Sequence, residues 1–428
     1  MGEGELNMKK RLLVLSFDAL AGKDFNLMAE MPEFKEFLAE ASYSTQVSAV
    51  YPSVTYPCHT SIITGKYPKN HGVMSNTLLQ AGRLDSPDWH WQRKSIKTET
   101  LYDLAIDQNM TVAAFLWPVT GKSRIQYNVP EIFPNRAWDH QLLVSMRNGS
   151  PRFLVELFGK YAHLLNGIKQ PNLDDFVTEA AIHTLKTRKP DLMLVHWTDL
   201  DTARHDHGVD SPEGTAAIHR LGGRFAKIVQ TLKDEGLYEE TILVVLGDHS
   251  QLDFHTKVPL NQRLKERGWV SLKGNKVVSW QVLAKSNGGS AYIYRRGQGP
   301  SDGELRHFLE EMQQDPANGI EVIRDAEEAA GEGADPECAF LLEAAEGYVF
   351  TDTLGGGEKG FKADHGYHPT EKKGYETFFA ARGPGIKKGA NAGPMSLVDH
   401  GPTWAQLLGL KLKNPDGRIL EEILEGDL

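Results

Sequence analysis

The stretch "RLLVLSFDAL" at residues 11–20 decides the fold that we expect for this chain. Its apolar run is nearly continuous and stops abruptly at Asp18. Continuous runs are typical of strands in a parallel sheet, because helices cover both faces of such a sheet. Three other stretches share the pattern: "MTVAAFLW" (110–117), "DLMLVHW" (191–197) and "TILVVLG" (241–247).

Helical patterns separate these expected strands. Apolar residues recur at helical spacing in "PEFKEFLAEAS", "TLYDLAIDQN", "NLDDFVTEAAIHTLKTR" and "TAAIHRLGGRFAKIVQTLKDEG". Alternating strands and helices predict an α/β protein with a doubly wound, mostly parallel sheet that has helices on both faces. Residues 119–172 show neither pattern clearly, so we expect an irregular region there.

The order of elements changes after His249. Residues 256–355 mix strand-like and helical stretches with the Gly-, Ala- and Glu-rich segment "RDAEEAAGEGADPECAF". We interpret them as a smaller α+β cap insertion that contains a loose acidic loop. Residues 8–255 and 356–428 then form the catalytic core, which resumes at "GYETFFAARGPGI" (374–386).

The composition narrows the function classes. The 428 residues carry a net charge of -10, which argues against a general binder of nucleic-acid polymers or membranes. Two cysteines, Cys58 and Cys338, form no disulfide framework and fit a reducing compartment. No stretch approaches the ~20 apolar residues of a membrane span. "MKKRLLVLSFDAL" lacks a cleavage site, so we expect a cytoplasmic protein. The oligomeric state stays open.

Acidic residues and histidines cluster just after the expected strands, where open α/β sheets bind ligands. Asp201 and His205 in "DLDTARHDHG" are four residues apart, so they lie on one helix face. The other candidates are Asp18 in "SFDAL", Asp248 and His249 in "GDHS", and His365 in "ADHGYHP". Carboxylate oxygens and imidazole nitrogens are ligands that Zn²⁺-like ions take. Two such ions ~3.5–4 Å apart can clamp a phosphoryl displacement.

A second feature accompanies these residues. "YPSVTYPCHTSIITGKYPKNHGV" (51–73) places hydroxyl groups where a strand leads into a helix. The N-terminus of a helix favours an anion, because its backbone N–H groups and its dipole point there. The segment is therefore a candidate for presenting a hydroxyl to a phosphate group.

Together these motifs resemble the type I phosphodiesterase/nucleotide pyrophosphatase family of the alkaline phosphatase superfamily, from residue 18 to residue 366. The resemblance implies an alkaline-phosphatase-like fold and two divalent ions, with Zn²⁺ expected. It assigns Asp201, His205 and His365 to the first ion. It assigns Asp18, Asp248, His249 and the Thr55 oxygen to the second.

The resemblance also implies roles in catalysis. Thr55 corresponds to the nucleophile, which forms a phosphothreonine intermediate. Asn76 corresponds to a residue that donates a hydrogen bond to phosphate. Tyr56 takes the place of an aromatic residue that stacks on a nucleobase. The implied substrate is a small phosphodiester or a nucleotide.

Some positions depart from the family pattern. Cys58 replaces the usual Asn. The segment "TDLD" (198–201) lacks the common Pro-Asp, so Asp199 is an alternative ligand to Asp201. His59 is interpreted as structural and His196 as packed, and His400 imitates the Asp-His motif without a matching ligand position.

The main functional hypothesis is a two-metal phosphodiesterase or nucleotide pyrophosphatase. One alternative is a phosphonoacetate-type or phosphomonoester hydrolase of the same superfamily. The other is a non-catalytic metal-binding protein on the same fold. A sulfatase is disfavoured because the chain has no segment from which formylglycine is made, and a phosphoglycerate mutase because the serine motif is absent.

Overall fold

The first expected strand is β1 (Arg11–Phe17), and it lies inside an eight-stranded sheet with the order β17-β2-β16-β6-β1-β5-β3-β4. The computed structural model describes residues 10–136, 138–274, 276–354 and 362–426. The other strands of this sheet are β2 (Ser42–Ser48), β3 (Val112–Phe115), β4 (Tyr127–Val129), β5 (Leu192–Trp197), β6 (Thr241–Leu246), β16 (Thr377–Arg382) and β17 (Met395–Ser396).

The sheet is mostly parallel, as the apolar runs predict. β1 pairs in parallel with β5 on one side and with β6 on the other. β3 continues the parallel pairing beyond β5, whereas β16 is antiparallel to both β6 and β2. The carboxyl ends of β5, β1 and β6 therefore lie next to one another.

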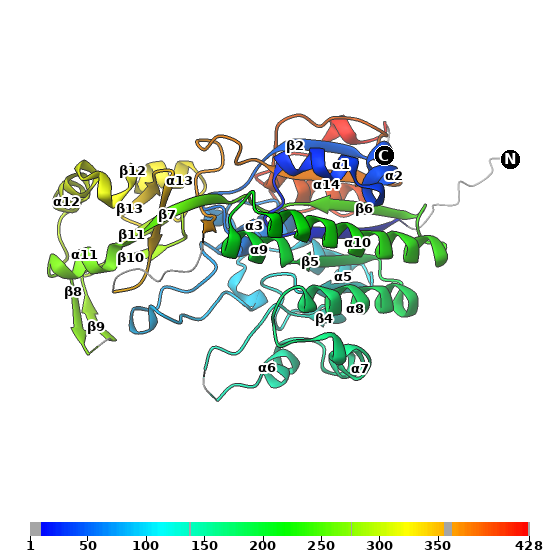
Figure 1. Ribbon diagram of the computed structural model, residues 1–428, viewed down its shortest axis with the longest axis horizontal. Coiled ribbons are helices and arrows are strands. Elements are labelled where there is room, and N and C mark those ends of the chain that lie inside the picture. The colour runs from blue at the N-terminus through cyan, green and yellow to red at the C-terminus, as the bar shows by residue number, and fades with distance from the viewer. Residues whose placement is uncertain (1–9, 137, 275, 355–361, 427–428) are drawn as a thin grey trace.

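Helices cover both faces of this sheet (Figure 1). Leu12 and Val14 of β1 face a cluster that includes side chains of α3, α5 and α14. Leu13 and Leu15 face the opposite cluster, to which α1, α2, α7 (Pro151–Tyr161), α8, α9 and α10 contribute. The bounds are α1 (Phe25–Glu30), α2 (Pro32–Glu40), α3 (Thr55–Thr64), α4 (Pro68–His71), α5 (Leu101–Asp107), α8 (Asn172–Arg188), α9 (Asp199–His207), α10 (Pro212–Asp234) and α14 (His400–Leu407).

The expectation of an irregular region over residues 119–172 is wrong in part. The region contains β4 and two helices, α6 (Gln141–Asn148) and α7 (Pro151–Tyr161). Pro151 occupies the first turn of α7, where a missing N–H costs nothing. Phe153, Leu154 and Leu157 then bury one stripe of the helix against the sheet.

The segment expected as a cap holds a separate four-stranded antiparallel sheet with the order β10-β11-β13-β12 and its own apolar cluster. Its elements gather at one end of the long axis in Figure 1. They are α11 (Leu260–Glu266), β8 (Val270–Lys273), β9 (Lys276–Trp280), β10 (Val282–Ser286), β11 (Ser290–Arg295), α12 (Asp302–Gln314), β12 (Ile320–Asp325), α13 (Ala326–Gly331) and β13 (Phe340–Ala344).

A third sheet, with the order β14-β7-β15, adjoins the cap. Its strands are β7 (Leu252–Pro259), β14 (Gly347–Thr351) and β15 (Ala363–Asp364). The expected boundary at residues 355 and 356 lies outside the described residues, so the division into two domains stays a prediction.

The acidic segment of the cap is not a loose loop throughout. It contains α13, whose N-terminus is closed by a capping box: Asp325 accepts from the backbone of Glu328, and the Glu328 side chain accepts from Asp325 N–H. Such a box satisfies two backbone donors that the first turn leaves free. Among the described residues, no helix combines the length and the apolar character that crossing a bilayer requires.

Candidate active site

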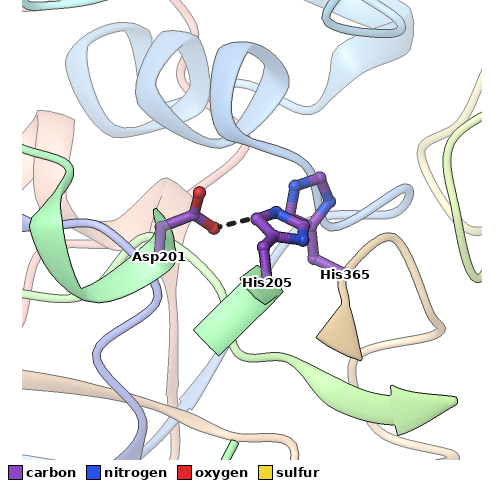
Figure 2. A group of neighbouring side chains, drawn as sticks. All are labelled: Asp201, His205 and His365. Atoms are coloured by element: carbon purple, nitrogen blue, oxygen red, sulfur yellow. Dashed lines mark ion pairs between the residues drawn. The ribbon is translucent and has the colours of Figure 1, made fainter. Parts of the chain in front are cut away.

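The first group of site residues comes from the ends of neighbouring elements. Asp201 and His205 lie on α9, which begins two residues after β5 ends, and His365 follows β15. The carboxylate oxygen of Asp201 lies 3.3 Å from Nε2 of His205 (Figure 2). One ligand atom from each of the three residues lies within 4.8 Å of the others. This is the grouping that the sequence resemblance assigned to the first ion.

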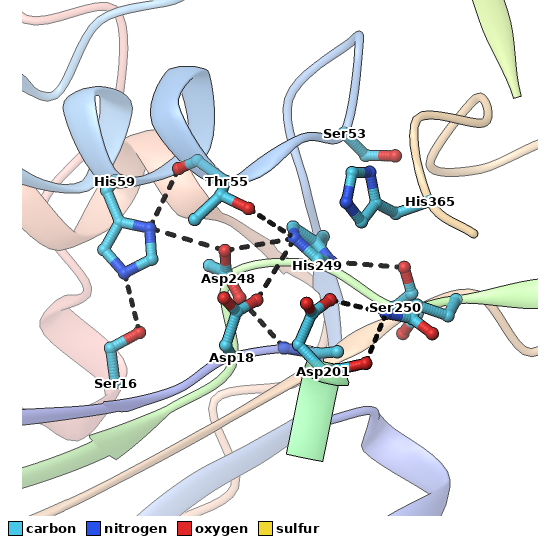
Figure 3. A network of polar contacts seen from close by, with 12 residues as sticks. Ser16, Asp18, Ser53, Thr55, His59, Asp201, Asp248, His249, Ser250 and His365 are labelled. Atoms are coloured by element: carbon cyan, nitrogen blue, oxygen red, sulfur yellow. Dashed lines mark hydrogen bonds and ion pairs between the residues drawn. The ribbon is translucent and has the colours of Figure 1, made fainter. Parts of the chain in front are cut away.

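The second group converges on His249, just after β6 (Figure 3). Nε2 of His249 lies 3.2 Å from the Thr55 hydroxyl oxygen and 3.3 Å from carboxylate oxygens of both Asp18 and Asp248. Ligand atoms of Asp18, Asp201 and His249 also lie within 4.8 Å of one another. Asp201, expected at the first ion only, is therefore within reach of both groups.

Thr55 is the first residue of α3. Val54 before it is extended, with φ -125° and ψ 154°, so the chain turns sharply into the helix at Thr55. The side chain is largely buried, with 7% of the residue exposed. The turn thus places the hydroxyl at the N-terminal end of α3, where the helix dipole favours negative charge.

Asn76 and Tyr56 lie beside this turn. The Asn76 side-chain oxygen accepts a hydrogen bond of 2.8 Å from the Tyr56 backbone N–H, so the amide nitrogen is left as the donor. Tyr56 itself is fully buried, and its ring centroid lies 5.2 Å from that of Trp89. The Tyr56 ring thus already packs against the Trp89 ring. The stacking of Tyr56 on a nucleobase stays a prediction.

Several buried polar atoms of the site lack hydrogen-bond partners among the described residues, and a bound cation could be the partner of each. These atoms are Asp18 Oδ1, Asp248 Oδ2 and His365 Nδ1. Burial raises the pKa of Asp18 well above its usual value, and the charges of Asp201 and Asp248 raise it further. Carboxylates this close repel one another unless a positive charge lies between them. Divalent ions suit this donor set of oxygens and imidazole nitrogens.

Asp199 and Asp201, the two alternatives for this ligand position, lie in different surroundings. The Asp199 carboxylate accepts hydrogen bonds of 2.7 and 2.8 Å from Arg220 and another of 2.8 Å from Arg224. Its charge is thus compensated within the α9–α10 contact. Asp201 is the member of the pair beside His205 and His365.

Sequence reasoning missed two supporting residues. His196, expected only to pack, lies 3.1 Å from Oδ2 of Asp18, and its other ring nitrogen lies 3.0 Å from the Leu116 carbonyl. Gln251 donates its side-chain amide to Asp201. The sequence signal for His196 was its place in an otherwise apolar strand. A buried imidazole needs a hydrogen-bond partner, so such a position indicates a polar neighbour.

The remaining candidates differ in role. His59, interpreted as structural, does lie in α3, but it also reaches 3.4 Å from the Asp248 carboxylate and 3.0 Å from the Ser16 hydroxyl. His400 is buried, finds no hydrogen-bond partner in the described ranges of the chain, and stacks on Trp404. Burial raises the pKa of the Cys58 thiol well above its usual value, which disfavours a thiolate nucleophile there.

The type I phosphodiesterase/nucleotide pyrophosphatase family model matches residues 12–368. The chain belongs to this family. The match confirms the resemblance drawn from the motifs and the prediction of a hydrolase. Its span includes every site residue described above, from Asp18 to His365.

Two named relatives are distant from this chain in sequence. Bis(5'-adenosyl)-triphosphatase ENPP4 of Pongo abelii is 24% identical over 414 residues, 95% of this chain and 79% of the relative. Ectonucleotide pyrophosphatase/phosphodiesterase family member 1 of Homo sapiens is 24% identical over 229 residues, 51% of this chain and 21% of the relative.

A solved structure shares the fold. An inactive form of murine ectonucleotide pyrophosphatase/phosphodiesterase 5 in complex with AMP superposes with a TM-score of 0.69 at 18% identity, covering 97% of this chain and 100% of that chain. The alkaline-phosphatase-like α/β architecture expected from the sequence is thereby confirmed.

Proposed function

We propose that this family member hydrolyses phosphodiester or phosphoanhydride bonds with two divalent ions, Zn²⁺ being the expected metal, through a phosphothreonine intermediate on Thr55. One observation carries the proposal. The Thr55 hydroxyl oxygen lies 3.2 Å from His249 Nε2, within a cluster of ligand atoms from Asp18 and Asp248. The position of this hydroxyl among candidate ligands supports a role as the nucleophile.

In this proposal each of the two groups of candidate ligands binds one ion. Asp201, His205 and His365 would hold one ion, and Asp18, Asp248 and His249 the other. When bound, such ions withdraw charge from phosphate oxygens and lower the pKa of hydroxyl groups and water. The three carboxylates of the site carry three negative charges, so two divalent ions leave a net positive site for an anionic substrate.

Thr55 performs the covalent step in this proposal. Its oxygen forms a bond to phosphorus while the bond from phosphorus to the leaving oxygen breaks, and the hydroxyl proton passes through solvent to that leaving oxygen. Water then attacks the same phosphorus, which restores the threonine hydroxyl and releases a phosphomonoester. Asn76, with its side-chain oxygen held by Tyr56 N–H, donates its amide to a non-bridging phosphate oxygen.

Nucleotides are the proposed substrate class. Two relatives bear names of nucleotide-cleaving enzymes, one a bis(5'-adenosyl)-triphosphatase and the other a nucleotide pyrophosphatase. The related murine structure is in complex with AMP. These names describe the relatives, and they support the same chemistry for this chain.

A substrate panel tests the proposal. The zinc-loaded protein is assayed on a nitrophenyl phosphodiester, a nitrophenyl phosphomonoester, a diadenosine polyphosphate and phosphonoacetate, with the Thr55→Ala variant as background. We expect the diester and the dinucleotide to be cleaved fastest. Faster cleavage of the monoester or of phosphonoacetate would contradict the proposal and favour one of the other hydrolases of the superfamily.

A further inference from the structure

Glu343 of β13 is a fully buried carboxylate outside the ligand groups. Its two oxygens accept hydrogen bonds from two different segments. The Tyr51 hydroxyl donates to Oε2 over 2.7 Å, and the His368 backbone N–H donates to Oε1 over 3.0 Å. The ring centroids of Tyr51 and His368 lie 4.9 Å apart, edge to face. Glu343 therefore joins these two segments from the cap side.

Both partners stand close to site residues along the chain. Tyr51 precedes Thr55 by four residues, and His368 follows His365 by three. The Glu343 carboxylate is thus one short stretch of backbone away from the nucleophile turn and one from a metal-ligand loop. We therefore expect a displacement of either partner to move a segment of the site.

The same two segments meet at a second point. The Gly366 N–H donates to the Ser53 carbonyl over 3.0 Å, and the Ser53 hydroxyl donates to the Tyr367 carbonyl over 2.7 Å. These bonds link the nucleophile turn to the His365 loop without the cap. Glu343 adds a link that runs through the cap sheet.

Burying the Glu343 carboxylate costs free energy. Desolvation penalises the charged form, and only nearby positive charge and donated hydrogen bonds offset it. Lys372 supplies the charge, with Nζ 3.4 Å from Oε1 of Glu343, and it also donates to the Ala344 carbonyl over 2.8 Å. An apolar side chain would fill the space, but it would not fix the directions of two donors as a carboxylate does.

We propose that Glu343 is a positioning residue that holds the Thr55 turn and the His365 loop at the spacing required to bind both ions, acting through Tyr51 and His368. Its effect on catalysis rests on the proposed function. Its effect on the two segments does not, so the two can be tested apart.

A matched pair of tyrosines makes the test sharp. Tyr51→Phe removes one donor to Glu343 and keeps the ring. Tyr294→Phe removes a similar bond of 2.6 Å to Asp335, which lies wholly within the cap. Both variants lose a tyrosine–carboxylate bond, but only the first loses one that reaches the site.

The first readout is hydrogen exchange of the metal-free protein, followed in residues 48–56 and 362–370. We expect Tyr51→Phe to speed exchange in both segments by about tenfold, the size of effect expected from one hydrogen bond to a charged group. Tyr294→Phe should leave both segments unchanged. Equal exchange in the two variants, or a change confined to the cap, overturns the proposal.

The second readout is zinc affinity by chelator competition, with kcat and KM on the nitrophenyl diester. We expect Tyr51→Phe to weaken zinc binding by about tenfold and to lower kcat with little change in KM. Glu343→Gln should stay within about threefold of the wild type, because its oxygen can accept from His368 N–H and its amide can donate to the Tyr51 oxygen. Unchanged zinc affinity in Tyr51→Phe overturns the proposal.

Failure of the two proposals looks different. If the wild-type protein cleaves no diester, the proposed function is wrong. The hydrogen-exchange rates of the two segments and the zinc affinity still test the role of Glu343. If the wild type is active and Tyr51→Phe matches Tyr294→Phe in all three measurements, the function stands and the positioning role falls.

Discussion

The hydroxyl oxygen of Thr55 lies 3.2 Å from Nε2 of His249, although 194 residues separate the two in the chain. The contact joins the start of α3 to the end of β6. It exists because β6 lies beside β1 in the sheet and α3 packs on the face next to them. The architecture of the sheet, and not any local motif, thereby brings the hydroxyl and the imidazole together.

Substituting Thr55 tests its role as nucleophile. Thr55→Ala should lower kcat on a phosphodiester by several orders of magnitude, because no covalent intermediate can form. Thr55→Ser keeps the hydroxyl and should retain substantial activity. Zinc content should be unchanged in both, since three protein ligands remain on that ion. Equal rates for the Ser and Ala variants would mean that Thr55 only shapes the turn.

Metal content tests the two ligand groups. We expect elemental analysis to find two divalent ions per chain, and dialysis against a chelator to abolish activity, with recovery on addition of Zn²⁺. The reason is that two groups of side chains could each hold an ion, with Asp201 in reach of both. A single ion per chain with full activity contradicts the two-metal mechanism.

Asp201→Asn and Asp199→Asn form a matched pair. The Asp201 variant should lose metal, because it removes a charged ligand. The Asp199 variant should keep its metal but lower the free energy of unfolding by roughly 2–4 kcal/mol, since it weakens a buried pair with Arg224. Metal content and chemical denaturation of both variants check this, and metal loss in the Asp199 variant alone would reverse the assignment.

His196 is expected to act through Asp18. His196→Phe removes the contact of 3.1 Å to the Asp18 carboxylate, so zinc affinity or kcat should fall by about 10–100-fold. His400→Phe is the control, because His400 is equally buried yet makes no hydrogen bond within the part of the chain that the structure describes. The control should bind zinc as the wild type does. The role of His196 is refuted by equal zinc affinity and kcat in the two variants.

Glu343 should also make stability depend on pH. Burial raises the pKa of Glu343 to about 7. The His368 N–H, Lys372 and the Tyr51 hydroxyl each lower this pKa in part. Arg324 lies over the Tyr51 ring and is a further positive charge nearby. A raised carboxyl pKa stabilises the fold below the unfolded-state pKa, and this contribution is lost as pH rises toward about 7.

Glu343→Gln lacks this titration. Between about pH 4.5 and about pH 7, the wild type should therefore lose on the order of 2–3 kcal/mol of unfolding free energy relative to the variant. Denaturation of both metal-free proteins across this range measures the difference. A difference that is constant with pH would show that Glu343 does not titrate in this window.

Local sequence determined the parts of this protein that depend on neighbours in the chain. The run 11–17 is β1 without change, and the stretch at 172–188 is α8, because a buried strand and an amphipathic helix each carry their own period. The motif residues Asp18, Thr55, Asp248 and His249 were candidates for the same reason, as each follows or begins a recognisable element.

Only the tertiary structure decided which side chains meet. The Asp18–His196 contact spans 178 residues and the Tyr51–Glu343 bond spans 292, so no local pattern contains them. The spacing to His205 favours Asp201 and leaves Asp199 as an alternative. The packing of α10 on α9 pairs Asp199 with Arg220 and Arg224. Sequence periodicity determines which face a residue occupies, but the partner on that face comes from another element, and only packing brings it there.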